Sequence, residues 1–401
     1  MQSVTIGSNQ AGQRLDKFLR KYLPNAGSGF LYKMLRKKNI TLNGRRAEGS
    51  EILALEDTVT FFFSEETLAK FSGLEPPDGS LRHNTVLRNN EGLRYEEDSE
   101  TEQSAEDALI KEGRKAYGLL QGITILYEDE NILVLNKPEG VLTQKADKKD
   151  SSLNEWLIGY LLEREPLFQK ELHTFHPSVC NRLDRNTSGI VLCGKSLAGS
   201  QYLSRCIRER TIRKYYRTIC VGILKEPQTI HGYLAKDTER NRVTVWENGD
   251  KAPQGADLIH TAYTPLAWNL AWNKKLPQDS EILRSDKAVR NYRALWNNET
   301  MSSCGYTLLE VELITGKTHQ IRAHLAGIDH PLIGDFKYGK TDINNRLKER
   351  YGLSHQLLHA CRVEFPKEEG GVGRALSGLV VCAPCPGAFT RLQEVLGLAC
   401  Q

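Results

Sequence analysis

The chain has 401 residues, 39% of them hydrophobic and 26% charged, which is the composition of a globular protein large enough for two domains. Its formal net charge of +4 is too small to identify a partner, so the placement of the basic residues matters more than their number. The first residues do not form a signal peptide, and no run of roughly 18 apolar residues exists to span a membrane. The sequence therefore predicts a soluble, cytoplasmic protein.

Residues 1–64 are predicted to form a small unit of their own. Apolar periodicity predicts two helices with one buried face each, framed by short strands, and the Asn43-Gly44 pair is a strong hairpin signal. The unit holds ten Lys and Arg residues against five Asp and Glu. In chain order, the expected strand, two helices and two strands lie at 4–6, 14–23, 29–37, 40–42 and 59–63.

The basic residues of this unit lie outside its predicted apolar faces. Any one of them reads as a solvated surface charge, but together they make an electrostatic footprint suited to an RNA backbone. The unit also resembles the S4 RNA-binding domain in the run Arg-Leu-Asp-Lys-Phe-Leu at 14–19 and in Ile-Thr-Leu-Asn-Gly at 40–44. The candidate RNA-binding residues are Arg14, Lys17, Lys33, Arg36, Lys37, Arg45 and Arg46.

Residues 65–121 are predicted to be a flexible acidic linker. Pro-Pro-Asp-Gly at 76–79 interrupts any regular element, and the acidic run at 96–102 has no apolar periodicity. Such a run is typical of a solvated linker, although it could instead mimic RNA or bind a partner.

Residues 122–401 are predicted to form an α+β catalytic domain with a mixed, largely antiparallel sheet. Its core elements follow from apolar runs and helical periodicity. Between 236 and 304 the pattern becomes irregular, which suggests an insertion. We expect strands at 123–127, 132–135, 190–193, 214–221 and 308–314, and helices at 153–162 and 200–209.

The most informative segment is 181–189, Asn-Arg-Leu-Asp-Arg-Asn-Thr-Ser-Gly, which precedes a buried strand. Asp184 stands between Arg182 and Arg185, whose positive charges favour an ionised carboxylate that can act as a nucleophile. Taken alone, Asp184 is more simply explained as an ion-pair or turn residue. The remaining motifs change that interpretation.

Segment 181–189 resembles the active-site segment of the RluA-type pseudouridine synthases, His-Arg-Leu-Asp-x-x-Thr-Ser-Gly, with Asn181 in place of the usual His. Lys-Tyr-Tyr at 214–216 is similar to the Lys-x-Tyr motif of that family. Residues 315–325 are similar to its Thr-Gly-Arg-x-His-Gln-Ile-Arg-x-His-Leu motif, with Lys317 for the first Arg. The three motifs occur in the family's order. Further matches lie at 330–335, 338–339, 358–360 and 383–386.

This resemblance implies an enzyme that isomerises uridine to pseudouridine in structured RNA. The carboxylate of Asp184 would attack the ribose or assist glycal formation, and the sequence leaves both open. Arg322 would pair with Asp184 and orient it. Tyr216 would stack on the uracil ring while it rotates, unless it is an ordinary core aromatic. Two further residues would handle the RNA, Arg182 by helping to occupy the space of the flipped base and Lys214 by contacting the RNA.

The chemistry implied by the resemblance needs no cofactor and no metal. Cys382 and Cys385 have zinc-knuckle spacing, but no second pair of ligands stands nearby to complete a site. The nine cysteines all lie at or beyond Cys180, so we expect free thiols in place of a disulfide framework.

Several other functions are weaker. A P-loop reading of Gly316-Lys317-Thr318 fails because Val311 stands where that motif needs glycine. The spacing of His355 and His359 could clamp a metal, but the carboxylate of an HExxH site is missing. A glycosidase is disfavoured by the basic N-terminal unit. A non-catalytic ribosome-assembly factor on the same scaffold remains the alternative class.

For an enzyme, large-subunit ribosomal RNA of the 23S type is the expected substrate, and transfer RNA is still open. The protein is expected to be a monomer.

Overall fold

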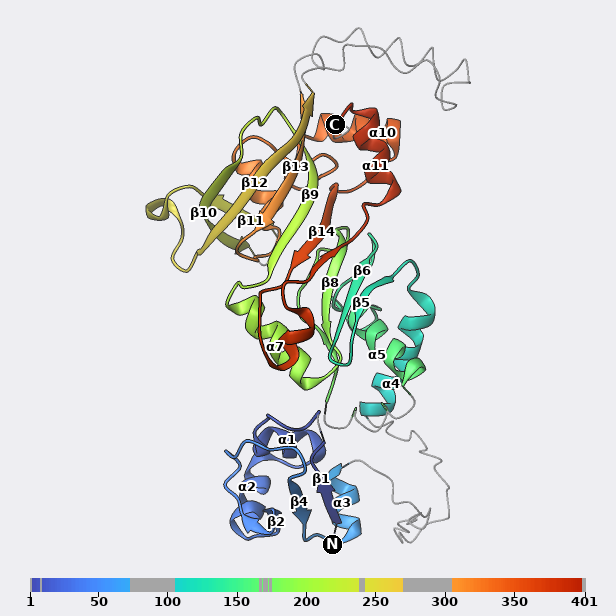
Figure 1. The fold of residues 1–401 in the computed structure, drawn as a ribbon, viewed down its shortest axis with the longest axis vertical. Coiled ribbons are helices and arrows are strands. Elements are labelled where there is room, and N and C mark those ends of the chain that lie inside the picture. The colour runs from blue at the N-terminus through green and yellow to red at the C-terminus, as the bar shows by residue number, and fades with distance from the viewer. Residues whose placement is uncertain are drawn as a thin grey trace, which may run out of the picture.

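The structure is a computed structural model. Figure 1 shows a small N-terminal unit and a larger body built around one long, twisted sheet. The cysteines in the described part of the chain are free thiols, as expected. In the same part, no helix is both long and apolar enough to cross a bilayer. The structure describes residues 2–7, 9–72, 105–165, 168, 172, 175–237, 242–269 and 305–398.

The N-terminal unit has the helices and strands expected from the sequence. Its antiparallel sheet has the order β1-β4-β2-β3, and the buried face of α1 is made by Leu15, Phe18, Leu19 and Tyr22. Asn43 and Gly44 have positive φ angles of 49° and 72°, as the predicted hairpin turn requires. The elements are β1 (Gln2–Thr5), α1 (Leu15–Tyr22), α2 (Ser28–Arg36), β2 (Ile40–Leu42), β3 (Arg45–Arg46), β4 (Thr58–Phe61) and α3 (Glu65–Ser72).

The predicted flexible linker is wrong at both of its ends. Helix α3 packs back onto the N-terminal unit, where the ring centroids of Phe71 and Phe30 are 4.4 Å apart. At the other end, helix α4 (Ala105–Leu119) packs against α5 (Leu153–Arg164) so closely that a Cβ on Gly159 would lie 2.2 Å from the Gly113 carbonyl oxygen. Residues 73–104, including the acidic run, lie outside the described residues.

The larger body is an α+β domain, and its sheet is mixed and largely antiparallel, as predicted. The main path has the order β11-β10-β12-β13-β9-β14-β8-β6-β5, while β15 pairs with β14 and β7 with β8. Only the β14–β8 pairing is parallel among the described strands. The strands are β5 (Thr124–Glu128), β6 (Ile132–Lys137), β7 (Ser178–Val179), β8 (Ser188–Gly194), β9 (Arg213–Val221), β10 (Gln228–Asp237), β11 (Arg242–Trp246), β12 (Asp257–Asn269), β13 (Tyr306–Leu313), β14 (Leu358–Glu364) and β15 (Val380–Cys382).

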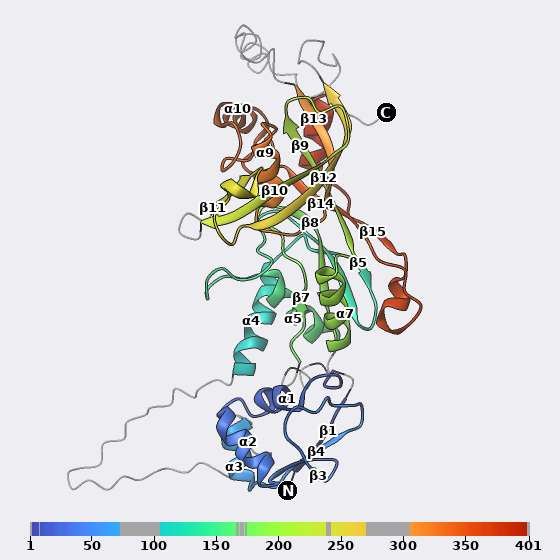
Figure 2. The same cartoon turned by 90° about the vertical axis from the view of Figure 1, so that its left-hand side faces the viewer.

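Helices cover both faces of this sheet. On one face, α4, α5 and α9 share a single apolar core with the strands, and Figure 2 shows α4 and α9 on the same side. On the opposite face, α7 covers one half of the sheet, while α10 and α11 cover the other end. The remaining helices are α7 (Leu197–Arg208), α9 (Gln320–Gly327), α10 (Thr341–Tyr351), α11 (Gly387–Val395) and the 3₁₀ helices η1 (Gly249–Lys251) and η4 (Gly371–Leu376).

Local capping explains why α5 and α7 begin where they do. Ser152 and Glu155 form a capping box at the start of α5. At the start of α7, the Ser196 hydroxyl accepts a hydrogen bond from the Gly199 N–H, so the helix begins three residues before the predicted Ser200.

The first half of the predicted insertion at 236–304 is regular structure, although its sequence pattern is irregular. Strands β10, β11 and β12 are regular members of the main sheet, and β12 pairs with both β10 and β13. A β-bulge between Pro265 and Ala267 interrupts the alternation of β12, which explains why the sequence pattern looked irregular. Residues 270–304 lie outside the described part.

Candidate active site

The loop that carries Asp184 is fastened to the sheet on both sides. It enters from β7 and runs into β8, and the Thr187 N–H donates to the Asp184 carbonyl oxygen at 3.0 Å, closing a turn. Gly189 follows with φ +110°, and a Cβ there would lie 2.2 Å from the Ala360 carbonyl oxygen. Glycine is therefore required for β8 to approach β14 and to place the loop.

Asn181, which replaces the usual His of the family motif, binds the backbone of β8. Its Oδ1 accepts from the Leu192 N–H at 2.7 Å, and its Nδ2 donates to the Ile190 carbonyl oxygen at 3.3 Å. The amide thus extends the edge of the sheet, and it makes no contact with Asp184 among the described interactions. The substitution affects loop attachment and leaves the carboxylate itself untouched.

Lys137 and Thr143 form hydrogen bonds with backbone groups of the same loop. The Lys137 ammonium is fully buried and donates to the carbonyl oxygens of Pro138, Val141 and Arg185 at 2.8–3.0 Å, which matches its three N–H groups to three acceptors. Burial lowers the pKa of Lys137 to about 7, against the opposing charges of Asp184 and Glu139. Thr143 Oγ1 donates to the Leu183 carbonyl oxygen at 2.9 Å and accepts from the Leu183 N–H.

The expected contact between Arg322 and Asp184 is present. Arg322 comes from α9, and its Nη1 donates to Asp184 Oδ2 at 2.9 Å. Its Nε and Nη2 donate to the two oxygens of Asp335 at 2.7 and 2.9 Å. The guanidinium therefore bridges two carboxylates, one fully buried at Asp335 and one 26% exposed at Asp184.

The electrostatics of this bridge favour the ionised forms of Arg322 and Asp335. Burial opposes the charge of Arg322, but the hydrogen bonds and charges of Asp335 and Asp184 raise its pKa above the ordinary value for arginine. Burial likewise raises the pKa of Asp335, yet Arg322 and the N–H groups of Lys337 and Tyr338 hold it below the ordinary 3.8. The Asp184 carboxylate is therefore fixed in position by a charged, anchored guanidinium and remains partly exposed to solvent.

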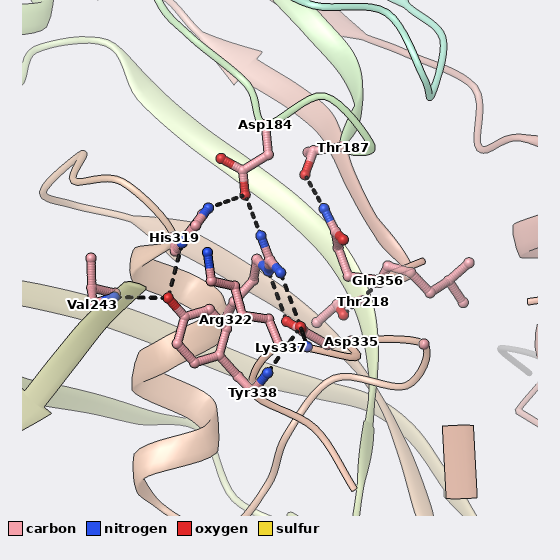
Figure 3. A network of polar contacts seen from close by, with 12 residues as sticks. Asp184, Thr187, Thr218, Val243, His319, Arg322, Asp335, Lys337, Tyr338 and Gln356 are labelled. Carbon is pink, nitrogen blue, oxygen red and sulfur yellow. Dashed lines mark hydrogen bonds and ion pairs between the residues drawn. The ribbon is translucent and has the colours of Figure 1, made fainter. Parts of the chain in front are cut away.

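A second chain of contacts reaches Asp184 from His319 (Figure 3). The Val243 N–H of β11 donates to the Tyr338 hydroxyl at 2.9 Å, and that hydroxyl lies 2.9 Å from His319 Nδ1. His319 Nε2 lies 3.8 Å from Asp184 Oδ2. Burial lowers the pKa of His319, while Asp184 raises it and Arg322 lowers it further.

Tyr216 and Lys214 lie on β9, on the side of the sheet that faces α9. Tyr216 is 5% exposed and belongs to the main core, so it is at once a core aromatic and a neighbour of the carboxylate. Burial, and then the charge of Asp184, raises the pKa of Tyr216 above 10.0, so its phenol is protonated at neutral pH. Lys214 Nζ lies beside Gly316, where an added Cβ would be 3.7 Å away, which brings the second and third motifs together.

The predicted RNA-binding residues other than the half-buried Lys214 are exposed, and none of them pairs with Asp184 among the described contacts. Arg182 and Arg185 are both exposed, and neither forms an ion pair with Asp184 among the described contacts. The charge that the sequence assigned to these neighbours comes instead from Arg322, which is 138 positions away. The seven candidate residues of the N-terminal unit are all exposed: Arg14, Lys17, Lys33, Arg36, Lys37, Arg45 and Arg46.

The sequence interpretation missed four residues of the site. Lys137, His319, Asp335 and Tyr338 all lie in segments that match family motifs or follow a predicted strand, but none was given a role. The available signal was their polar character in otherwise apolar surroundings, such as Lys137 at the end of the run Ile-Leu-Val-Leu. Their partners could not be assigned, because each contact spans elements far apart in the chain.

The arrangement defines a site for nucleophilic or acid–base chemistry at a carboxylate. One oxygen of Asp184 accepts from Arg322 at 2.9 Å and lies 3.8 Å from His319 Nε2, and the carboxylate is partly exposed. Among the residues that the structure describes, no group of three or more His, Cys, Asp or Glu side chains is arranged to hold a metal ion.

Comparisons with known proteins identify the class of enzyme. Residues 131–327 match the family model described as RNA pseudouridylate synthase. Ribosomal large subunit pseudouridine synthase C of Vibrio vulnificus is 27% identical over 366 residues, covering 91% of this chain and 88% of that protein. The enzyme of the same name from Escherichia coli K12 is 26% identical over 363 residues, covering 90% and 88%. The chain belongs to the RNA pseudouridylate synthase family and is an RNA pseudouridine synthase.

Solved structures give a looser match. The human RNA pseudouridylate synthase domain containing 4 is 20% identical to this chain, with a TM-score of 0.45, and the match covers 72% of this chain and 97% of that one.

Proposed function

We propose that this enzyme converts uridine to pseudouridine in large-subunit ribosomal RNA, with Asp184 as the reacting carboxylate. The observation that carries the proposal is the partly exposed Asp184 carboxylate, held at 2.9 Å by a buried arginine that is itself anchored by Asp335. The names of the Vibrio and Escherichia relatives support ribosomal RNA as the substrate class. Because ribosomal RNA is the proposed substrate, we also propose a cytoplasmic location. Because one chain supplies every residue placed around Asp184, we propose that the enzyme acts as a monomer.

The reaction exchanges one glycosidic bond for another. The bond between C1′ and N1 breaks, the uracil rotates, and a bond forms between C1′ and C5. The proton on C5 then leaves to solvent and N1 gains a proton, so that the product is an isomer of uridine. If Asp184 bonds to C1′ in between, that bond breaks as C1′–C5 forms. Asp184 attacks C1′ or assists a glycal intermediate. Tyr216, as a protonated phenol, stacks on the ring during rotation and can accept the C5 proton only by giving up its own.

The target uridine must leave its helix before this chemistry can begin. Flipping costs a few kcal/mol of unstacking, which contacts outside the reacting centre offset. We assign Arg182, which is exposed two residues before Asp184, to the space left by the flipped base. Lys214 contacts the RNA near the third motif.

The substrate class is tested by tritium release from RNA labelled at uridine C5. We expect the enzyme to release tritium from large-subunit ribosomal RNA, and at least about tenfold more slowly from a transfer RNA pool at equal uridine concentration. The reason is that proteins bind their specific nucleic-acid sites with affinities that exceed their non-specific affinities by far more than tenfold. Faster release from transfer RNA would overturn the substrate class while leaving the activity in place.

We also propose that residues 2–72 form an S4-like RNA-binding unit. Support comes from two helices and a hairpin that expose the seven candidate basic side chains around one compact core. The hydroxyl and carboxylate contacts within the unit tie down its acidic groups, as Asp16 does with Arg14 at 3.0 Å and with Tyr32 at 3.0 Å. Most of the remaining positive charge is therefore available for phosphates.

Replacing Lys33, Arg36 and Lys37 with Gln should weaken RNA binding and flatten its salt dependence. Loss of three phosphate contacts predicts that the slope of log K against log salt concentration falls by about 2 to 3. The measurement is a salt titration of binding by fluorescence anisotropy. A triple replacement of the exposed Lys367, Arg374 and Arg391 changes the charge equally and should leave the slope unchanged. An equal change in both variants would contradict the role of the unit.

A further inference from the structure

His319 stands where the helix that carries Arg322 begins, and its backbone is unusual. It is the residue before α9, with φ +55° in the left-handed region, and its side chain is only 10% exposed. A non-glycine residue in this conformation is strained, and such strain persists where the surrounding structure enforces it, most often at functional sites. The strain points the imidazole toward Asp184 on one side and Tyr338 on the other (Figure 3).

The groups on the two sides of His319 favour one tautomer of its ring. The Val243 N–H can only donate, so the Tyr338 oxygen accepts from it, and the phenol hydrogen remains free to donate to His319 Nδ1 at 2.9 Å. The opposite tautomer would point the lone pair of Nε2 at the negatively charged Asp184 oxygen, which is unfavourable. With Nδ1 as the acceptor, the hydrogen of the neutral ring is on Nε2, which faces Asp184 Oδ2 at 3.8 Å.

We propose that His319 is a positioning residue, fixed by Tyr338, whose Nε2–H joins Arg322 in holding Asp184 Oδ2 so that Oδ1 is presented to the ribose. Arg322 donates to the same oxygen at 2.9 Å, and Figure 3 shows the other oxygen pointing away from both donors. The 3.8 Å separation is longer than a hydrogen bond, and catalytic contacts commonly shorten when substrate binds. This inference rests on the proposed role of Asp184.

A neutral imidazole suits this task better than a charged one. Arg322 already supplies a full positive charge at 2.9 Å, and a second charge at His319 would weaken the carboxylate as a nucleophile. Burial lowers the pKa of His319, so the ring is neutral where the enzyme works. A neutral N–H donor orients the carboxylate without neutralising it.

The test compares His319→Asn with His319→Gln in steady-state tritium release. Asn tolerates the left-handed backbone but places its amide near Nδ1, so it loses the donor to Asp184. Gln places an amide N–H near the position of Nε2 and keeps that donor. We expect His319→Asn to lower kcat about 10- to 100-fold with KM changed less than about threefold, the size of a lost hydrogen bond to a charged group. The kcat of His319→Gln should lie within about fivefold of the wild-type kcat, even though Gln tolerates the left-handed backbone less well than Asn does.

A double-mutant cycle tests whether Tyr338 acts through His319. Tyr338→Phe should lower kcat about fivefold in the wild-type background and leave it unchanged in the His319→Asn background. A general loss of packing would lower kcat in both backgrounds. Equal losses in His319→Asn and His319→Gln, or an equal effect of Tyr338→Phe in both backgrounds, would overturn the inference.

The proposed function has a separate failure signature. If Asp184→Asn is inactive while His319→Asn retains the wild-type kcat, only the role of His319 falls. If Asp184→Asn keeps the wild-type rate, the proposed role of Asp184 falls and this inference falls with it.

Discussion

Asp184→Asn should abolish tritium release from C5-labelled RNA. The substitution removes the negative charge that the reaction needs but keeps the size of the side chain, and the amide oxygen can still accept from Arg322 Nη1. Loss of a reacting group that works with several partners lowers kcat by about 10⁴-fold or more. RNA affinity should change by less than about threefold, because a neutral amide does not repel the RNA phosphates more than the carboxylate does.

The measurement is single-turnover tritium release with enzyme in excess, together with an RNA-binding titration. Asp16→Asn is the matched control, since Asp16 is a partly buried carboxylate that also pairs with an arginine, Arg14, at 3.0 Å. This control lies in the N-terminal unit and should keep kcat. A rate in Asp184→Asn above about a tenth of the wild type would show that the carboxylate does not take part in bond exchange.

Much of the fold could be predicted because its elements are governed by local patterns. The buried strand β8 and the amphipathic helix α1 are visible as an apolar run and a helical periodicity. Helices α3 and α4 were missed because their stability comes from partners that are remote in the chain. Gly113, for example, makes a helix less favourable locally, but it allows the close contact with Gly159 of α5.

The motif residues of the candidate site could be predicted from the sequence, but most contacts between side chains that are far apart in the chain could not. Asp184 and Arg322 could be paired because family motifs carried both. The charges of Arg182 and Arg185 looked relevant from adjacency alone, yet adjacent residues in a loop point in different directions, and both side chains are exposed. The partners of Lys137 and Tyr338 are carbonyl, N–H and imidazole groups on other elements, which no local pattern encodes.

Arg322→Met should be the most destabilising single change at the site. Arg322 is 7% exposed, and its loss leaves the fully buried Asp335 carboxylate without its charged partner. Removing one member of a buried ion pair costs about 3 to 5 kcal/mol of unfolding free energy. The measurement is urea unfolding at neutral pH followed by circular dichroism. Arg322→Met/Asp335→Leu removes the stranded charge and should recover part of the loss, whereas a double variant as unstable as Arg322→Met would contradict this account.

The pH dependence of the unfolding free energy should differ between the wild type, where Asp335 is paired with Arg322, and Arg322→Met, where Asp335 has lost that partner. In the wild type its pKa lies below 3.8, so its stabilising contribution is complete above that value and disappears as the pH falls through the lowered pKa. In Arg322→Met, burial without the arginine raises the Asp335 pKa above its unfolded value, and protonation then relieves the stranded charge. The stability gap between wild type and variant should therefore be largest near neutral pH and narrow on acidification. A gap that stays constant down to about pH 4 would mean that packing of the guanidinium, and not its charge, holds Asp335 in place.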